Sequence, residues 1–318
     1  MRCLGIDFLR GIAAFGIVGC HLGLSPRTPV GNLVTTFCDF NVGLFAAIAG
    51  FLMCGAHNGS EWLEYVKKRA IRLLPIYLVW SVIYLVVIAI FDLLLDGGQV
   101  NARYSTTKFW ISALFWGGGA AHLWFLSSLF YVQILVARLF GACGKQWHGI
   151  AWIIAGGVLI KLGLRMDNWY GIYPIRLLAF IVTGYGLRRL VEPIVIKRYV
   201  IALSGAVALA LAFHFFAVGR IHSFYADWIA VGPVLTLFVA LDLKSVRLQK
   251  IATLLGATSL GVYLVHPIFT RALSFGVAKI LPSPYAVSVV LSDWLLAWAC
   301  SFVTVLILRK MPLLRRYS

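Results

Sequence analysis

Long apolar segments alternate with short polar connections along the whole chain. Since about 20 residues of helix, at ~1.5 Å each, cross the hydrocarbon layer of a bilayer, the pattern predicts ten membrane-spanning helices. They cover residues 4–24, 37–56, 73–95, 121–140, 149–164, 173–190, 199–217, 227–243, 251–271 and 287–308. The connections show no sign of a separate soluble domain. We therefore predict an all-α, polytopic membrane helix bundle that forms one domain over residues 1–318.

Composition and charge support this class and indicate an orientation. Apolar residues make up 61% of the 318 residues and charged residues 12%, which is typical of a membrane protein. The net charge of +17 would indicate nucleic acid for a soluble protein, but here we expect no nucleic-acid partner, because basic residues gather in cytoplasmic loops. With the N-terminus inside, roughly two thirds of the Lys and Arg residues are cytoplasmic. An even number of helices then places both termini in the cytoplasm.

The first segment carries three polar side chains, Asp7, Arg10 and His21. On a helix that turns ~100° per residue, Arg10 and His21 lie about 20° apart around the axis and about 16 Å apart along it. Asp7 falls within about 40° of the same line. Gly11 and Ala14 lie beside this polar stripe, which would let another helix pack closely against it.

The polar stripe has a structural and a functional interpretation. An arginine that faces lipid costs about 3 kcal/mol even on a lenient scale, so the stripe is expected to face the bundle interior or a wet cavity. In the structural interpretation, Asp7 and Arg10 neutralise each other at i, i+3 and His21 lies at the interface. In the functional one, the cation holds an anionic ligand while the imidazole does proton chemistry.

A basic pair lies at the cytoplasmic start of the third segment. Arg69 and Arg72, at i and i+3, share one helix face, and forked guanidinium groups suit phosphates. Taken alone, an anchor for lipid headgroups is the simpler explanation of this pair. Pro75 indicates that the helix begins or kinks near this point.

Two histidines lie elsewhere in predicted helices. His122 comes next to Trp124 at the outer start of the fourth segment, an arrangement typical of an aromatic belt. His266 lies deep in the ninth segment, where Pro267 interrupts the helix hydrogen bonds, although a structural histidine is the commoner case. The six cysteines show no metal-ligand spacing, and we expect no metal site.

Together, in this order, these groups resemble the acyltransferase 3 family of integral membrane acyltransferases, over nearly the whole chain. The opening motif D-x-x-R-G-x-A-A…H is matched by Asp7, Arg10, Gly11, Ala13, Ala14 and His21. The second segment resembles F-x-x-x-S-G-F-L through Phe45, Gly50, Phe51 and Leu52, with Ala49 in place of the serine. Later motifs are matched by Arg69, Arg72 and Pro75, by residues 122–126, by Arg176 and Gly184, and by Tyr263, Leu264 and His266.

The resemblance implies an enzyme that takes an acyl group, commonly acetyl, from cytoplasmic acyl-CoA and delivers it to a hydroxyl on the opposite face of the membrane. It assigns acyl-CoA binding to Arg10, Arg69 and Arg72, and the reaction to His21. No permanently bound cofactor is implied, since acyl-CoA is a co-substrate. We expect the acceptor to be an extracytoplasmic glycan or a polyprenyl-linked saccharide, and the membrane to be a bacterial inner membrane.

The role and the surroundings of His21 stay open at this point. It acts either as general base towards the acceptor hydroxyl, which we favour slightly, or as a nucleophile that carries the acyl group. Asp7, about 21 Å away along the helix, is too far to orient it, which leaves Asp39 or Asp293 as candidates. The supporting or acceptor-side residues are predicted to be Asp7, Asp39, His122, Trp124, Arg176, Tyr263 and His266. The alternative function is a membrane transporter of a small anion or acyl donor.

Overall fold

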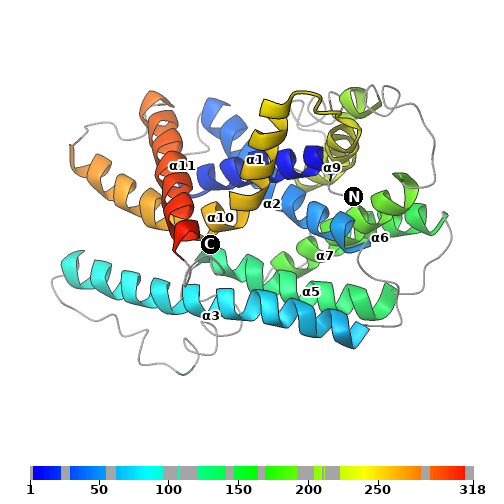
Figure 1. Ribbon diagram of the computed structural model, residues 1–318, viewed down its shortest axis with the longest axis horizontal. Coiled ribbons are helices and arrows are strands. Elements are labelled where there is room, and N and C mark those ends of the chain that lie inside the picture. Colours follow the sequence, from blue (N-terminus) through cyan, green and yellow to red (C-terminus); the bar gives the residue numbers. More distant parts are fainter. Residues whose placement is uncertain are drawn as a thin grey trace. The chain divides into compact units, whose positions relative to one another are not determined.

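The fold is helical throughout the part of the chain that the computed structural model describes (Figure 1). The described residues are 3–22, 29–54, 62–95, 107, 121–140, 147–163, 169–191, 204–209, 211, 223–280 and 287–311. Within them the elements are α1 (Leu4–Gly19), α2 (Pro29–Cys54), α3 (Trp62–Leu95), η2 (Ala121–Leu123), α5 (Trp124–Phe140), α6 (Trp147–Gly163), α7 (Trp169–Val191), α9 (Ser223–Ala240), α10 (Val246–Ile280) and α11 (Val287–Lys310). These ranges contain no strand, and the all-α prediction is confirmed.

The predicted segments correspond to these helices, with two differences that affect the functional residues. Helix α1 ends at Gly19, so His21 lies in the turn after the helix and not on it. Helix α3 begins at Trp62 and contains Pro75, so of the two alternatives predicted at Pro75 the helix start is wrong, while a kink there stays a prediction. The predicted segment 199–217 lies largely outside the described residues.

Several helices are long and apolar enough to cross a membrane. Among the described residues these are Trp62–Ile90, Val246–Leu273 and Ser288–Lys310, and four shorter helices are also apolar. Helices α3 and α6 expose apolar side chains at intervals of three or four residues: Ile71, Leu74, Leu78, Val82, Val86 and Ile90, and Ile150, Ile154, Val158 and Leu162. Such one-sided apolar stripes suit contact with lipid chains. The cytoplasmic position of the termini stays a prediction.

The chain divides into two compact units. The first consists of Met1–Ala56 and Ala142–Ile307, and the second of His57–Gly141 and Leu308–Ser318. The second unit therefore combines a segment that interrupts the sequence of the first with the C-terminal residues. The prediction of one domain stays a prediction.

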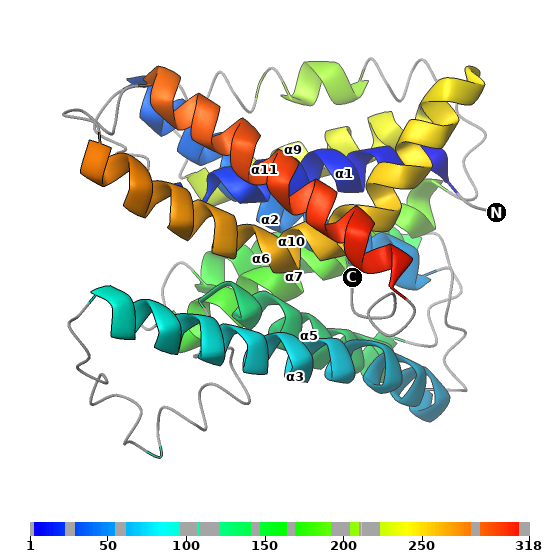
Figure 2. The ribbon, with the colours of Figure 1, turned by 60° about the vertical axis from the view of Figure 1, so that its left-hand side comes forward.

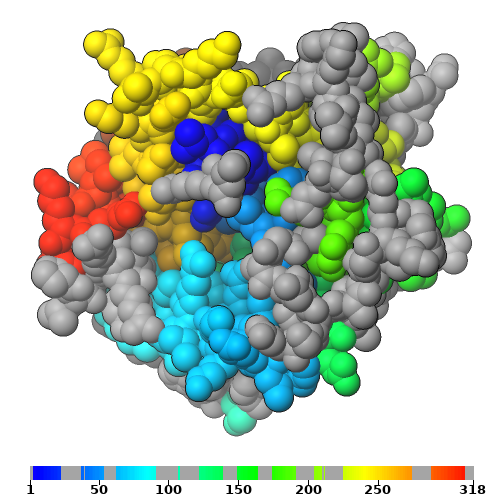
Figure 3. Space-filling view, turned by 45° about the vertical axis from the view of Figure 1, so that its right-hand side comes forward, coloured from blue at the N-terminus to red at the C-terminus, as the bar shows by residue number. Residues whose placement is uncertain are grey.

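Helix α1 is the central element of the first unit, where it packs against α2, α9 and α10 (Figure 2). Glycines permit the close approach. A Cβ atom added at Gly11 would lie 3.2 Å from Leu255 Cγ, and one added at Gly256 would lie 2.6 Å from Asp7 Cβ. The start of α1 lies beside the segment that links α9 to α10, and both are visible at the surface (Figure 3). The predicted close packing beside Gly11 is confirmed.

Helix α7 is a second packing centre of the same unit and contacts α2, α6 and α9. Its crossing with α2 brings backbone against backbone. A Cβ atom at Gly50 would collide with the Ile181 carbonyl, and one at Gly184 would collide with the Ala47 carbonyl. This reciprocal contact leaves no space for a side chain at either glycine.

The second unit is built on α3 and α5, which pack against each other. The ring of Tyr84 on α3 meets the ring of His122 edge-on, with 4.4 Å between centroids. Towards the other end of the pair, the Arg138 guanidinium lies 5.5 Å from the ring centroid of Trp62. Contacts at both ends show that α3 and α5 run antiparallel.

Candidate functional site

Asp7 and Arg10 form an ion pair on α1 in the first unit. The distance from Arg10 Nη1 to Asp7 Oδ1 is 3.8 Å, and their side chains are 23% and 11% exposed. Asp7 is held against α10 at Gly256. The pairing expected at i, i+3 is thus present, and it lowers the cost of placing both charges in an apolar bundle. The Arg10 side chain stays partly exposed, and its binding of an anionic ligand stays a prediction.

His21 lies in the turn that follows α1. Its backbone N–H donates to the Val18 carbonyl at 3.3 Å, and its side chain is exposed. The preceding residue, Cys20, continues the turn with its N–H on the Ile17 carbonyl at 3.1 Å. The imidazole is therefore carried by a short turn at the end of a buried helix.

His266 on α10 lies beside His21. The two imidazole centroids are 5.0 Å apart with a tilt of 44°. His266 itself is completely buried. The ring of Tyr263, one turn earlier and also buried, has its centroid 6.0 Å from that of His266. The first and ninth predicted segments therefore bring an exposed and a buried histidine together.

The backbone of α10 fixes the His266 ring. Nδ1 lies 2.7 Å from the Tyr263 carbonyl oxygen and 3.3 Å from the Val262 carbonyl oxygen. The next residue is Pro267, which has no N–H to donate to the carbonyl four residues earlier, and that residue is Tyr263. Because Pro267 leaves this carbonyl without its usual helical donor, the carbonyl accepts a hydrogen bond from His266 instead.

The two aspartates expected near His21 lie on other helices. Asp39 is on α2, and its side chain lies outside the described residues. Asp293 is on α11 and is partly exposed. Its neighbour Trp294 anchors α11 to α1, since Nε1 donates to the Phe15 carbonyl at 2.8 Å and the indole stacks on the Phe15 ring at 4.8 Å. An orienting role for either aspartate stays a prediction.

Arg69 and Arg72 project from the first third of α3, in the second unit. The Arg69 Nε donates to the Tyr65 hydroxyl at 3.0 Å, and its guanidinium carbon lies 5.1 Å from the Tyr65 ring centroid. Arg72 is exposed. Arg69 is thus held by an aromatic neighbour, while the Arg72 guanidinium is accessible to a ligand.

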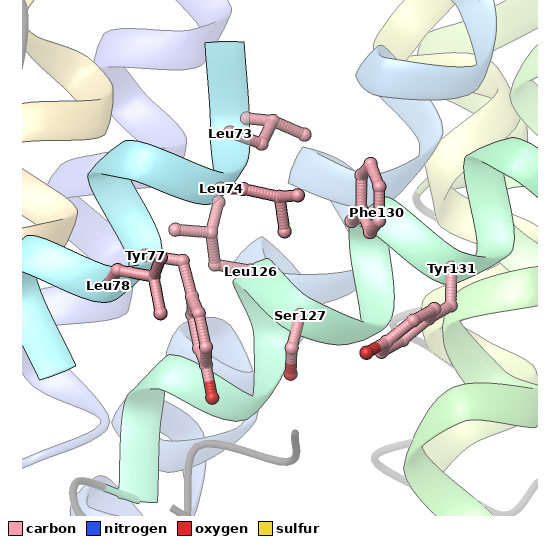
Figure 4. A pocket seen from close by; sticks show the side chains of 8 residues that line it. All are labelled: Leu73, Leu74, Tyr77, Leu78, Leu126, Ser127, Phe130 and Tyr131. Carbon is pink, nitrogen blue, oxygen red and sulfur yellow. The ribbon is translucent and has the colours of Figure 1, made fainter. Parts of the chain in front are cut away.

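An apolar groove lies along α3, and its lining begins at Leu73, one residue after Arg72 in the sequence (Figure 4). It has a volume of about 220 Å³ and lies between α3 and α5. Its lining is Leu73, Leu74, Tyr77, Leu78, Leu126, Ser127, Phe130 and Tyr131. The Ser127 hydroxyl donates to the Trp124 carbonyl at 3.1 Å, which leaves the groove mainly hydrocarbon and aromatic in character. Such a lining favours an apolar chain over a sugar.

A comparison with protein families decides what these motifs belong to. The family model of an acyltransferase domain matches residues 4–308. The chain belongs to the acyltransferase 3 family. Neither the curated proteins nor the solved structures contain a significant match. Membership supports acyltransferase activity, and together with the apolar helices it indicates an integral membrane protein.

The remaining predicted residues of this acyltransferase 3 protein lie on other elements than the histidine pair. Arg176, on α7 in the first unit, is partly buried beside the end of α6. His122 is buried and Trp124 partly exposed, both in the second unit. Acceptor-side roles for these residues stay predictions. The binding of one acyl-CoA molecule by Arg10 together with Arg69 and Arg72 also stays a prediction, because Arg10 belongs to the first unit and the other two belong to the second.

Sequence reasoning named His21 and His266 separately but missed their pairing. The signal that could have revealed it is the proline directly after His266. A histidine followed by proline in a helix has a free backbone carbonyl within reach of its Nδ1. Such a histidine is fixed in orientation, which suits it to act on a partner from another helix.

Proposed function

We propose that this acyltransferase 3 protein transfers an acyl group, in the first instance acetyl, from cytoplasmic acyl-CoA to a hydroxyl of an extracytoplasmic glycan or lipid-linked saccharide. His21 is the catalytic residue of this reaction. The observation that carries the proposal is the position of His21, an exposed residue in the turn after α1, beside a buried and backbone-bound His266.

In the proposed reaction, His21 acts as general base. The acceptor oxygen attacks the thioester carbonyl carbon while its proton passes to an imidazole nitrogen of His21. The carbon–sulfur bond then breaks, and the proton moves from the imidazolium to the thiolate, which leaves as the free thiol of CoA. No other reactant is needed, and His21 returns to its neutral form. An acyl-imidazole intermediate would use the same residue in two steps.

The anionic part of acyl-CoA requires cations, which Arg10 and the Arg69/Arg72 pair supply in this proposal. Arg72 is the most exposed of the three, and the groove whose lining begins at the next residue, Leu73, suits an apolar chain. The expected site is the cytoplasmic side of a bacterial inner membrane, where acyl-CoA is available. Fixed guanidinium groups in a slot of low dielectric bind phosphates more strongly than they do in water.

We expect Arg72→Ala to raise the KM for acetyl-CoA by about 10-fold or more while kcat changes little. A hydrogen bond to a charged group is worth about 1.5–3 kcal/mol, and this one would be made in the ground state and the transition state alike. The measurement is the initial rate of acetyl transfer in membrane vesicles over a range of acetyl-CoA concentrations.

Lys67→Ala is the matched control for Arg72→Ala. Lys67 is exposed on the same helix and carries the same charge, but it points about 140° away around the axis. We expect its KM to stay within about 2-fold of the wild type. If both variants change only the amount of protein in the membrane, the pair is an anchor for lipid headgroups and not a donor site.

The proposed function is tested on the surface glycan of the producing cells. Cells that contain the protein should carry alkali-labile acyl esters on this glycan, and cells without it should lose them. Membrane vesicles given acetyl-CoA with a labelled acetyl group should place the label in the glycan fraction. Label that crosses the membrane without forming an ester would instead indicate a transporter.

A further inference from the structure

We propose that His266 is a positioning residue that fixes the tautomer and orientation of the catalytic imidazole of His21. The inference rests on the proposed function of His21 as general base. It assigns the orienting role to a neutral histidine on α10, where sequence analysis expected an aspartate on α2 or α11.

The hydrogen bonds of His266 determine its tautomer. Its Nδ1 faces two backbone carbonyl oxygens, at 2.7 Å from Tyr263 and 3.3 Å from Val262. Carbonyl oxygens only accept hydrogen bonds, so Nδ1 must carry the proton. In the neutral ring the other nitrogen, Nε2, is then an acceptor. The missing N–H of Pro267 leaves the Tyr263 carbonyl available to hold the ring in this form.

The geometry of the histidine pair then decides which nitrogen of His21 carries the proton. The ring centroids are 5.0 Å apart, and His266 Nε2 makes no direct hydrogen bond to His21 in this state. The hydrogen bond that we propose therefore forms when the acceptor binds, as the His21 ring turns one nitrogen towards Nε2. Because Nε2 of His266 accepts, the His21 nitrogen that faces it must donate. The opposite nitrogen of His21 then carries the lone pair. In the proposed arrangement this lone pair faces away from His266, where an incoming hydroxyl can meet it, and His21 is an exposed residue.

The arrangement of the two histidines favours the transition state over the ground state. When His21 takes the proton of the acceptor hydroxyl it becomes an imidazolium, and its N–H towards His266 becomes a charge-assisted donor. The hydrogen bond therefore strengthens as the transition state forms, which lowers the barrier. His266 keeps its own proton on Nδ1 throughout, so no net proton leaves the pair when His21 returns its proton to the CoA thiolate.

The test compares two variants of the full-length protein in membrane vesicles with labelled acetyl-CoA. His266→Phe retains a ring of similar size but removes the acceptor. Pro267→Ala retains His266 and restores a helical N–H for the Tyr263 carbonyl, which releases the imidazole from its fixed tautomer. We expect each variant to lower kcat, by about 10²-fold for His266→Phe and about 10-fold for Pro267→Ala, with the KM for acetyl-CoA within about 2-fold of the wild type.

Pro267→Ala separates positioning from structure, because removal of a proline from a helix is expected to raise thermal stability while kcat falls. It also decides the outcome if His266→Phe fails to accumulate. A Pro267→Ala protein with wild-type kcat overturns the inference, as does a His266→Phe protein that keeps wild-type kcat. If kcat stays normal in these variants but is lost in His21→Ala, only the pairing is rejected. If His21→Ala is also fully active, the proposed function itself is rejected.

Discussion

Replacement of His21 by alanine is expected to lower the rate of acyl transfer by about 10²–10⁴-fold, the usual contribution of a general base. The protein should still fold, because His21 is exposed in a turn outside α1 and its truncation leaves no cavity in the core. The measurement is kcat for acetyl transfer in membrane vesicles, normalised to the amount of full-length protein, together with the ester content of the surface glycan.

Cys20→Ala is the matched control, since it changes the neighbouring side chain of the same turn and leaves the imidazole in place. We expect it to retain wild-type kcat. Undiminished transfer by a well-accumulated His21→Ala protein would remove His21 from the mechanism. Label that stays covalently attached to the wild-type chain without acceptor, but not to His21→Ala, would identify His21 as an acyl carrier and not as a base.

The second large effect is expected at the crossing of α2 and α7. Gly184→Ala should destabilise the first unit by about 3 kcal/mol or more, because the added methyl group collides with the backbone carbonyl of Ala47, which no rotamer change can relieve. The two helices would have to separate along their whole contact. The measurements are the amount of protein that accumulates in membranes and the temperature of unfolding in detergent.

Gly163→Ala provides the comparison for this substitution. A methyl group there meets only the side-chain atoms Ile175 Cγ2 at 3.5 Å and Arg176 Cγ at 3.7 Å, which are ordinary contact distances. We expect the unfolding temperature to change little or to rise, since alanine favours a helix over glycine. Equal behaviour of the two alanine variants would contradict the close crossing of α2 and α7.

Much of the fold follows from the hydropathy pattern, because every long apolar segment must satisfy its backbone hydrogen bonds within itself in a membrane. Helix ends are harder to predict. The apolar run continues past Gly19 to Leu24, yet α1 stops at Gly19. In α3 the polar turns before Leu73 are helical although their hydropathy is low. The apolar character of a segment reports how strongly it prefers lipid. It does not report the residue at which the helical hydrogen bonds begin or end.

The candidate site was only partly predictable for a related reason. Motif spacing identified His21 and His266, since each residue belongs to a local pattern. Their contact depends on how α1 crosses α10, which is set by Gly11 against Leu255 and by Asp7 against Gly256. Small residues show that a close approach is permitted, but they do not specify which helix makes it.

The crossing of α2 and α7 also constrains how the protein is made. These helices belong to the same unit, yet α3, η2, α5 and α6 are synthesised between them. When α2 leaves the ribosome, α7 has not yet been synthesised. The face of α2 around Gly50 therefore contacts lipid until α7 enters the membrane. The first unit is therefore completed only late in translation, after residues 57–141 of the second unit have been synthesised. A nascent chain that is stalled before α7 would hold α2 in a form accessible to membrane chaperones and proteases.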